Sequence, residues 1–384
     1  MAEFRMPSLG ADMEAGTLVE WKIKPGDSVK RGDVVAEVVT EKGDIEIESW
    51  LTGIVEQLIV QPGEKVPVKT VMAIIRIEDE KGPTAAAEHP APPLSLPPGE
   101  TPVEGGRESR PPSHRLRISP AAQKRIEAAH LDASTLTGTG PNGTITMADV
   151  EAALAAKPAA EDASAAMRRA IARAMSRSKR EIPHYYLADT IDMTKALAWL
   201  DRENASRELP RRLLYSALLL KAVALAVRDV PEMNGTVVDD QWTPSEAVHV
   251  GVATSLRTGG LIAPAIHDVA NKTLDEVMTA LRDLVNRVRS GGLRSSELSD
   301  PTITVTSLGD RGCESVFPII YPPQVAIVGF GSIVERPWAE NGLVGARRVI
   351  HASLAGDHRV SDGHRGALFL RAIGEGLQRP EGLT

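Results

Sequence analysis

A long stretch rich in proline and alanine most constrains how this chain of 384 residues can fold. Residues 81–114 (KGPTAAAEHPAPPLSLPPGETPVEGGRESRPPSH) contain almost no large apolar side chains, so they cannot bury enough surface to offset the entropy of ordering. A shorter segment of the same chemistry, AAKPAAEDAS, occupies 155–164. These segments predict linkers at 80–112 and 155–164 that separate three bodies, at 1–79, 113–154 and 165–384. Two tethers between three bodies indicate that one body travels.

The composition argues against some classes of partner and indicates the compartment. A formal charge of −7 leaves no basic excess for nucleic acid or an anionic membrane. The longest apolar run, Leu213–Val227, is interrupted by Lys221 and is too short for a bilayer, so it predicts a buried helix. The first residues, MAEFRMPSLGADMEAG, have neither a signal-peptide core nor a transit pattern. A single cysteine, Cys313, excludes an internal disulfide, so we expect a cytoplasmic protein without a membrane span.

The first body contains an internal repeat. GTLVEWKIKPGDSVKRGDVVA from Gly16 and GIVEQLIVQPGEKVPVKTVMA from Gly53 align at a constant offset, with a Pro-Gly pair at the same place in each. Each half alternates apolar and polar residues between turns, which predicts an all-β sandwich or flattened barrel. Between the halves, EVVTEKGDIEIES reads as a hairpin with Lys42 at its tip.

The second and third bodies have different patterns. In the second, Ser119 and Pro120 begin a predicted helix that ends near Ala129, and a second helix begins near Thr146 after a Gly-rich loop. The third body mixes helices and strands without strict alternation, which predicts an α/β domain with a mixed sheet. Its helices are expected at 213–229 and 273–290 and its strands near 247–255, 302–307, 324–330 and 348–355.

Three motifs in this order resemble one family, the dihydrolipoyl acyltransferase components of 2-oxoacid dehydrogenase complexes. VTEKG with its following strand is similar to the lipoyl-domain hairpin. SPAA, GTGPNG and ADVEAAL resemble the two-helix peripheral-subunit-binding domain, and DHRVSDG within 351–370 resembles the signature of a catalytic domain of chloramphenicol-acetyltransferase type. The resemblance implies a multidomain enzyme that transfers an acyl group from a dihydrolipoyl arm to coenzyme A and also scaffolds its complex.

The resemblance also assigns site residues. Lys42 would carry covalent lipoic acid, because an exposed hairpin tip leaves an attached arm free to swing. His358 would be the base that deprotonates the coenzyme A thiol, without an acyl-enzyme, since a histidine titrates near working pH. Thr306 would donate to the oxyanion and Asp362 would keep the site in shape. Ser307 is the weaker oxyanion candidate, because neighbouring strand residues face opposite sides. No metal site is implied.

The resemblance implies partners as well. These are the 2-oxoacid decarboxylase, dihydrolipoamide dehydrogenase, a lipoate ligase or lipoyl transferase, and further copies in a homotrimer or larger core. The family places arginines in the small binding domain where Gln123 and Thr144 stand here, which leaves Lys124 and Arg125 as candidate contacts for the dehydrogenase.

Several alternatives stay open. The chain could be a non-catalytic lipoyl scaffold, although the presence of His358 favours an enzyme. Lys42 could carry biotin, although the methionines that flank a biotinyl lysine are missing. Acetyl is the expected acyl group, with branched-chain or acetoin-derived groups as alternatives.

Overall fold

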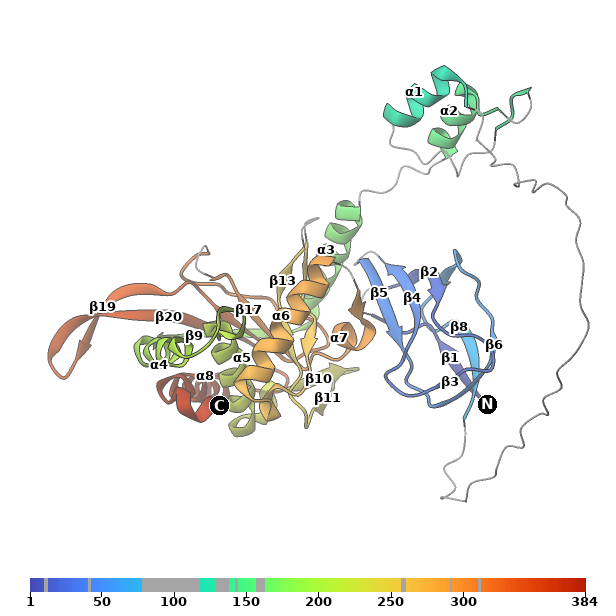
Figure 1. Ribbon diagram of the computed structural model, residues 1–384. Coiled ribbons are helices and arrows are strands. Elements are labelled where there is room, and N and C mark those ends of the chain that lie inside the picture. The colour runs from blue at the N-terminus through green and yellow to red at the C-terminus, as the bar shows by residue number, and fades with distance from the viewer. Residues whose placement is uncertain are drawn as a thin grey trace, which may run out of the picture. The chain divides into compact units, whose positions relative to one another are not determined.

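The computed structural model describes residues 1–9, 13–40, 43–77, 118–128, 138–141, 144–156, 163–256, 260–290, 292–309 and 312–384. The chain divides into two compact units, one made of Met1–Glu78 with Ala163–Thr384 and one of Asp79–Asp162. Figure 1 identifies their elements, with the N-terminal strands in blue and the C-terminal ones in red.

The N-terminal body is built from two similar halves, as the repeat predicts. Four strands, β1 (Ala2–Arg5), β8 (Val71–Arg76), β6 (Gly53–Leu58) and β3 (Ser28–Val29), form one sheet. The second sheet runs β5 (Gly43–Glu48), β4 (Val34–Thr40), β2 (Ala15–Trp21) and β7 (Lys65–Pro67). Because β3 of the first half pairs with β6 of the second, and β7 of the second pairs with β2 of the first, the halves exchange their short strands.

Equivalent hydrogen bonds lock the two halves together. The amide of Gly26 donates to the carbonyl of Val55, and the amide of Gly63 donates to the carbonyl of Leu18, both over 2.7 Å. Both glycines have positive φ, 95° and 90°, which a residue with a Cβ rarely adopts. The Pro-Gly pairs are therefore the corners of each half, and the alternating side chains between them form the core.

The small second unit has the predicted helix pair, α1 (Pro120–Ala128) and α2 (Met147–Ala156). Ser119 accepts a hydrogen bond from the amide of Ala122 over 3.3 Å, which confirms it as the N-cap. Among the residues described in this unit, four buried side chains form its core: Ala122, Ile126, Ile145 and Val150.

The C-terminal body surrounds a mixed sheet. Its strand order is β15 (Ala265–Ile266), β12 (Val250–Val252), β17 (Ile303–Ser307), β18 (Ala326–Phe330), β20 (Leu343–Asp357) and β19 (Val334–Glu340), with β9 (His184–Asp192) also paired to β20. Strands β12, β17 and β18 are parallel, whereas β20 is antiparallel to β18, β19 and β9. The prediction of a mixed sheet is confirmed.

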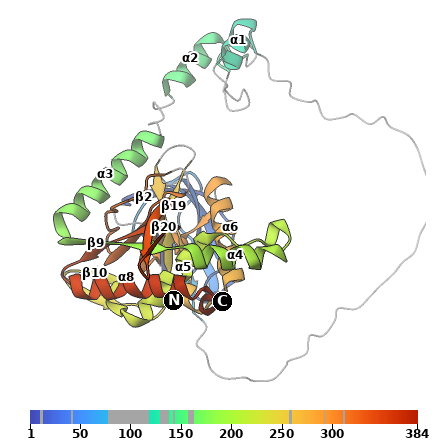
Figure 2. The same ribbon diagram turned by 90° about the vertical axis from the view of Figure 1, so that its left-hand side faces the viewer.

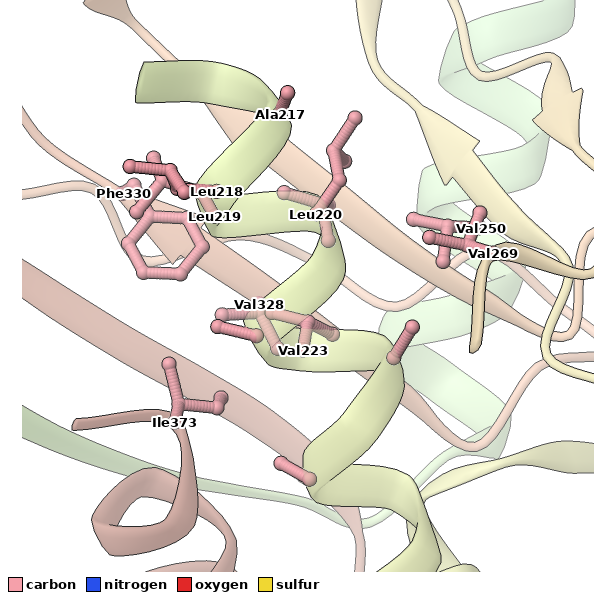
Figure 3. Close-up of a cluster of buried hydrophobic side chains, with 14 of the residues drawn as sticks. Ala217, Leu218, Leu219, Leu220, Val223, Val250, Val269, Val328, Phe330 and Ile373 are labelled. Atoms are coloured by element: carbon pink, nitrogen blue, oxygen red, sulfur yellow. The ribbon is translucent and has the colours of Figure 1, made fainter. Parts of the chain in front are cut away.

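Helices cover this sheet. They are α3 (Ala163–Glu181), α4 (Thr194–Ala205), α5 (Tyr215–Asp229), α6 (Leu274–Ser290), α7 (Ser295–Ser299) and α8 (Gly363–Gln378). Figure 2 shows α3 on one side of β20 and α4 and α6 on the other. The apolar run read as a buried helix is α5, whose Leu218, Leu219 and Val223 face Phe330 and Val328 of the sheet (Figure 3).

Alternate side chains of β18 pack into apolar clusters on opposite faces of the sheet. Val328 and Phe330 of β18 point into the large core around α5, whereas Ile327 lies in a smaller cluster with Ile182 and Ala355. Both faces of β18 are therefore apolar.

Phe330 tests the importance of the α5 contact, because its ring is fully buried. We expect Phe330→Ala to lower the free energy of unfolding of the C-terminal body by about 3–5 kcal/mol, since a cavity replaces the ring. Phe317→Ala is the matched control, because Phe317 is 58% exposed. Calorimetry of both variants checks this, and equal losses in the two would contradict the packing described.

Candidate active site

His358 lies in the turn between β20 and α8, with its side chain exposed. Its backbone amide donates to the carbonyl of Pro183 over 3.0 Å. Its imidazole meets the ring of Tyr185 edge-on, with 5.4 Å between centroids and 74° between planes. The backbone of this histidine is therefore fixed, while its ring stays open to an incoming molecule.

Tyr185 is held in place by two glycines and a hydroxyl. It pairs with Gly356 across β9 and β20, and a Cβ on Gly356 or Gly366 would come within 2.4 or 2.9 Å of its ring. Its hydroxyl is 2.8 Å from Oγ of Ser361, and burial raises the pKa of the phenol. The ring thus forms a rigid wall beside His358. Sequence reasoning missed this residue, because nothing in HYYLADTID marks it.

An ion pair flanks the histidine on both sides in sequence. Asp357 is fully buried and accepts two hydrogen bonds from Nε and Nη2 of Arg359, at 3.1 and 2.8 Å. Nη1 of Arg359 reaches Asp240 at 3.0 Å, in the turn between β10 (Gly235–Val238) and β11 (Gln241–Pro244). The hydrogen bonds to Asp357 raise the pKa of Arg359. A buried carboxylate needs such a partner, so this pair fixes the turn that carries His358.

Asp362 caps the helix that follows. Its carboxylate accepts a hydrogen bond from the amide of Arg365 over 3.0 Å at the start of α8. That backbone bond holds the pKa of Asp362 below its ordinary value, and a further backbone bond from His364 acts in the same direction. The contribution of this aspartate is to set where the turn ends and α8 begins.

Thr306 lies near the C-terminal ends of β17 and β18, whereas His358 follows β20 beside the N-terminal end of β18. Thr306 pairs with Gly329 of β18, which in turn pairs with Ser353 of β20. From Ser353, β20 continues for four more residues to Asp357, about 13 Å of strand at about 3.3 Å per residue, before His358 follows in the turn. A single chain does not bring Thr306 and His358 together.

Two cavities adjoin these residues. One, of about 750 Å³, is lined by Arg359 together with Asp240, Tyr321 and Gln324. The other, of about 560 Å³, runs along α6 from Arg289 to Met278 and reaches Ser307 and Gly309 at the end of β17. Ser307 lines this second cavity with Val305, the alternate residue of β17, as strand alternation predicts.

The hairpin lysine, Lys42, falls outside the described residues, but the strands on either side of it are placed. Thr40 and Gly43 are opposite each other in the β4–β5 ladder, and Oγ1 of Thr40 donates to the carbonyl of Gly43 over 3.2 Å. The predicted hairpin is therefore confirmed on both sides of its tip.

The candidate contacts of the small unit differ from each other. Lys124 is exposed, whereas Nε of Arg125 is bonded to Glu151 at 2.9 Å. Where the family has arginine, Thr144 donates from its hydroxyl to the carbonyl of Pro141 over 2.7 Å. Of the two candidates, Lys124 presents its charge more openly to a partner.

The described parts of the chain hold no group of three His, Cys, Asp or Glu side chains that could bind a metal ion. None of the helices placed in the structure has the length and apolar character needed to cross a membrane.

Protein-family models match all three bodies. The model for the catalytic domain of 2-oxoacid dehydrogenase acyltransferases matches residues 158–384. A model described as biotin-requiring enzyme matches 2–75, and an E3-binding domain model matches 116–151.

Similar proteins cover the whole chain. The acetyltransferase component of a pyruvate dehydrogenase complex from Zymomonas mobilis is 29% identical over 99% of both chains. The acyltransferase component of the branched-chain α-keto acid dehydrogenase complex from Pseudomonas aeruginosa is 32% identical, over 98% of this chain and 97% of its own.

Two solved structures match the C-terminal body. A probable dihydrolipoamide acetyltransferase from Listeria monocytogenes is 30% identical with a TM-score of 0.53, over 55% of this chain and 91% of that one. The Azotobacter vinelandii dihydrolipoamide acetyltransferase is 26% identical with a TM-score of 0.54, over 57% of this chain and 90% of that one. In the Azotobacter protein, a serine, a histidine and an asparagine were investigated for a role in catalysis.

His184 gives a test of the site's framework. Its Nδ1 is 2.8 Å from the carbonyl of Ile182, and its Nε2 accepts from the amide of Ile320 over 3.2 Å, so the neutral ring with a proton on Nδ1 fits. Burial lowers the pKa of His184 below its ordinary 6.5. The folded state therefore takes up the second proton, which charges the ring, less readily than the unfolded state. The free energy of unfolding consequently falls as pH drops below about 6.5.

We expect the thermal stability of His184→Gln to fall less than that of the wild type between about pH 6.5 and 5. His364→Gln, at an exposed position on α8, should leave the pH dependence unchanged. The part that remains is expected from His249, whose pKa burial also lowers. Melting curves across this pH range check the prediction, and identical slopes for the wild type and His184→Gln would refute it.

Proposed function

Because this chain belongs to the family of 2-oxoacid dehydrogenase acyltransferases, we propose that His358 and Thr306 catalyse its acyl transfer and that Lys42 carries its lipoyl arm. The chain is an acyltransferase that moves an acyl group from a dihydrolipoyl arm to coenzyme A. Its N-terminal body is a lipoyl domain, and its second unit is an E3-binding domain.

The observation that carries the assignment of His358 is its setting. The ion pair of the buried Asp357 with Arg359, the carbonyl of Pro183 and the wall of Tyr185 fix the turn, yet the imidazole is exposed. A general base needs this combination, because it must reach a substrate proton in a set geometry while it remains accessible.

The reaction proposed for this site has two proton transfers through one histidine. His358 takes the proton from the coenzyme A thiol, and the sulfur adds to the thioester carbonyl. The resulting oxyanion accepts a hydrogen bond from the Thr306 hydroxyl, a contribution of roughly 3 kcal/mol in comparable sites. The bond from carbon to the dihydrolipoyl sulfur then breaks, and that sulfur receives the proton from His358. The products are the acyl-coenzyme A and the free dithiol.

The Azotobacter acetyltransferase supports these roles. Along that chain, the serine, the histidine and the asparagine investigated for catalysis have the same separations as Thr306, His358 and Asp362 have here. A threonine keeps the hydroxyl donor of serine. Like asparagine, Asp362 has a side-chain oxygen that can accept a hydrogen bond; here it caps α8, and we infer that it positions the turn of His358 rather than contacting the substrate.

The distance between Thr306 and His358 supports a shared site. Since they lie at opposite ends of one sheet, the hydroxyl and the base can meet only if they come from different copies. We propose a homotrimer in which His358 of one copy faces Thr306 of the next, either alone or as the unit of a larger core. A related structure is described as the cubic core of a pyruvate dehydrogenase complex.

The proposed partners follow from the domains. The lipoyl arm on Lys42 would be installed by a lipoate ligase or lipoyl transferase and acylated by the 2-oxoacid decarboxylase. Dihydrolipoamide dehydrogenase would dock on the small unit near Lys124 and reoxidise the arm. The exposed single thiol of Cys313 is suited to a reducing cytoplasm.

Mixed assemblies test the shared site. We expect His358→Ala to lower turnover about 10²–10⁴-fold and Thr306→Ala about 10²–10³-fold, while both variants still accept lipoate on Lys42. Co-expressed chains that carry one substitution each should regain about a quarter of the wild-type activity, because random pairing leaves that share of sites intact. If mixing restored nothing, both residues would have to come from one copy.

The acyl group is the second prediction. We propose acetyl, as in the Zymomonas relative, with the branched-chain groups of the Pseudomonas relatives as the alternative. Transfer from acetyl-, isobutyryl- and succinyl-dihydrolipoamide should be fastest with acetyl. A higher kcat/KM with isobutyryl would assign the chain to branched-chain substrates instead.

A further inference from the structure

One sheet of the lipoyl domain is extended at its edge by a short strand of the catalytic domain. Strand β16 (Leu293–Arg294) adds to the edge of β5 in parallel, with Leu293 opposite Ile45 and Arg294 opposite Glu46. An edge strand presents unpaired amides and carbonyls, and a short added strand satisfies them. The contact lies on the strand that directly follows the attachment lysine.

Hydrogen bonds from the next two residues strengthen this contact. Oγ of Ser295 accepts from the amide of Glu48 over 3.0 Å. The Glu48 carboxylate in turn accepts from the amide of Ser296 at 3.3 Å and from its hydroxyl. Hydrogen bonds to a charged group are stronger than those between neutral groups, so Glu48 is the main polar contact.

An apolar side chain completes the interface. Leu298 of α7 packs against the core of the lipoyl domain and against the core of the catalytic domain. We define the docking segment as residues 293–298. Its ladder of two residues is short, which suits a contact that must release the domain to visit other enzymes.

The parallel register gives the contact a direction. Gly43 follows Lys42 in the chain and lies two residues before Ile45 on β5, and α6 ends at Ser290, three residues before Leu293. The hairpin end of β5 therefore points toward the end of α6. Arg289 at that end lines the cavity that continues to Ser307 and Gly309, directly after Thr306.

We propose that the docking segment receives the lipoyl domain by strand addition and holds the hairpin end of β5 toward the end of α6. This proposal rests on the proposed function, since it concerns how the same arm reaches the same site. The docking segment sets the rate of delivery from the attached domain, while a free acyl-dihydrolipoamide does not need it.

The test substitutes Glu48 and measures two donors in the full-length lipoylated protein. Glu48→Lys removes the acceptor of both hydrogen bonds from Ser296, and we expect transfer to coenzyme A from the attached lipoyl domain to fall at least about tenfold, the effect of losing even one hydrogen bond to a charged group. Transfer from free acetyl-dihydrolipoamide should be unchanged. Glu56→Lys is the matched control, because Glu56 lies on β6 of the other sheet.

A charge-swapped pair protects the test from a trivial loss of folding. Glu48→Lys combined with Ser296→Asp should regain most of the lost transfer, and intact mass should show full lipoylation of every variant. Unchanged or faster transfer from the attached domain in Glu48→Lys would overturn the proposal, because the contact would then be idle or inhibitory. Absence of transfer from free acyl-dihydrolipoamide in the wild type would instead refute the proposed function.

Discussion

The ladder between β9 and β20 is the constraint on which the catalytic domain depends. The two strands pair without a break from Asp192 opposite Val349 to His184 opposite Asp357. This pairing brings Tyr185 onto Gly356 and the carbonyl of Pro183 to the amide of His358. The proposed base, His358, directly follows the end of this long regular ladder, and a regular ladder resists the small displacements that would weaken a catalytic contact.

The charges at the end of this ladder reinforce it. Asp357 is fully buried, and an unpaired carboxylate there would be costly. Arg359 offsets this with paired hydrogen bonds and reaches on to Asp240, so the turn is tied to a second hairpin. Removing either partner would leave a buried or partly buried charge without its counter-ion, so the turn needs both residues to be stable. The histidine between the two charged residues gains a fixed backbone without losing exposure.

The sequence predicts those parts of the structure that depend on neighbouring residues. The repeat from Gly16 and Gly53 predicts the paired halves, because alternation and Pro-Gly corners act locally. The N-cap at Ser119 and the buried helix α5 are confirmed for the same reason. For the site, the DHRVSDG motif identifies His358 and Asp362 through family resemblance, and their roles remain proposals.

The parts that could not be predicted are contacts between distant segments. Tyr185 lies beside His358 only because β9 pairs with β20, and its sequence neighbourhood is that of an ordinary strand. The same holds for Arg359 with Asp240 and for β16 beside β5, since each joins residues more than a hundred positions apart. Such contacts depend on the tertiary fold, which periodicity and capping signals do not encode.

The separation of Thr306 from His358 and the docking of the lipoyl domain have a common consequence. If two copies share each site, catalysis depends on assembly, and a lone folded chain has its base without its oxyanion donor. The lipoyl domain then has to stay near the catalytic domain without binding it permanently. A tether supplies a high effective concentration, so a docking contact of only a few hydrogen bonds suffices to orient the arm. A stronger contact would hold the domain at one station, because the same carrier must also leave to be acylated and reoxidised.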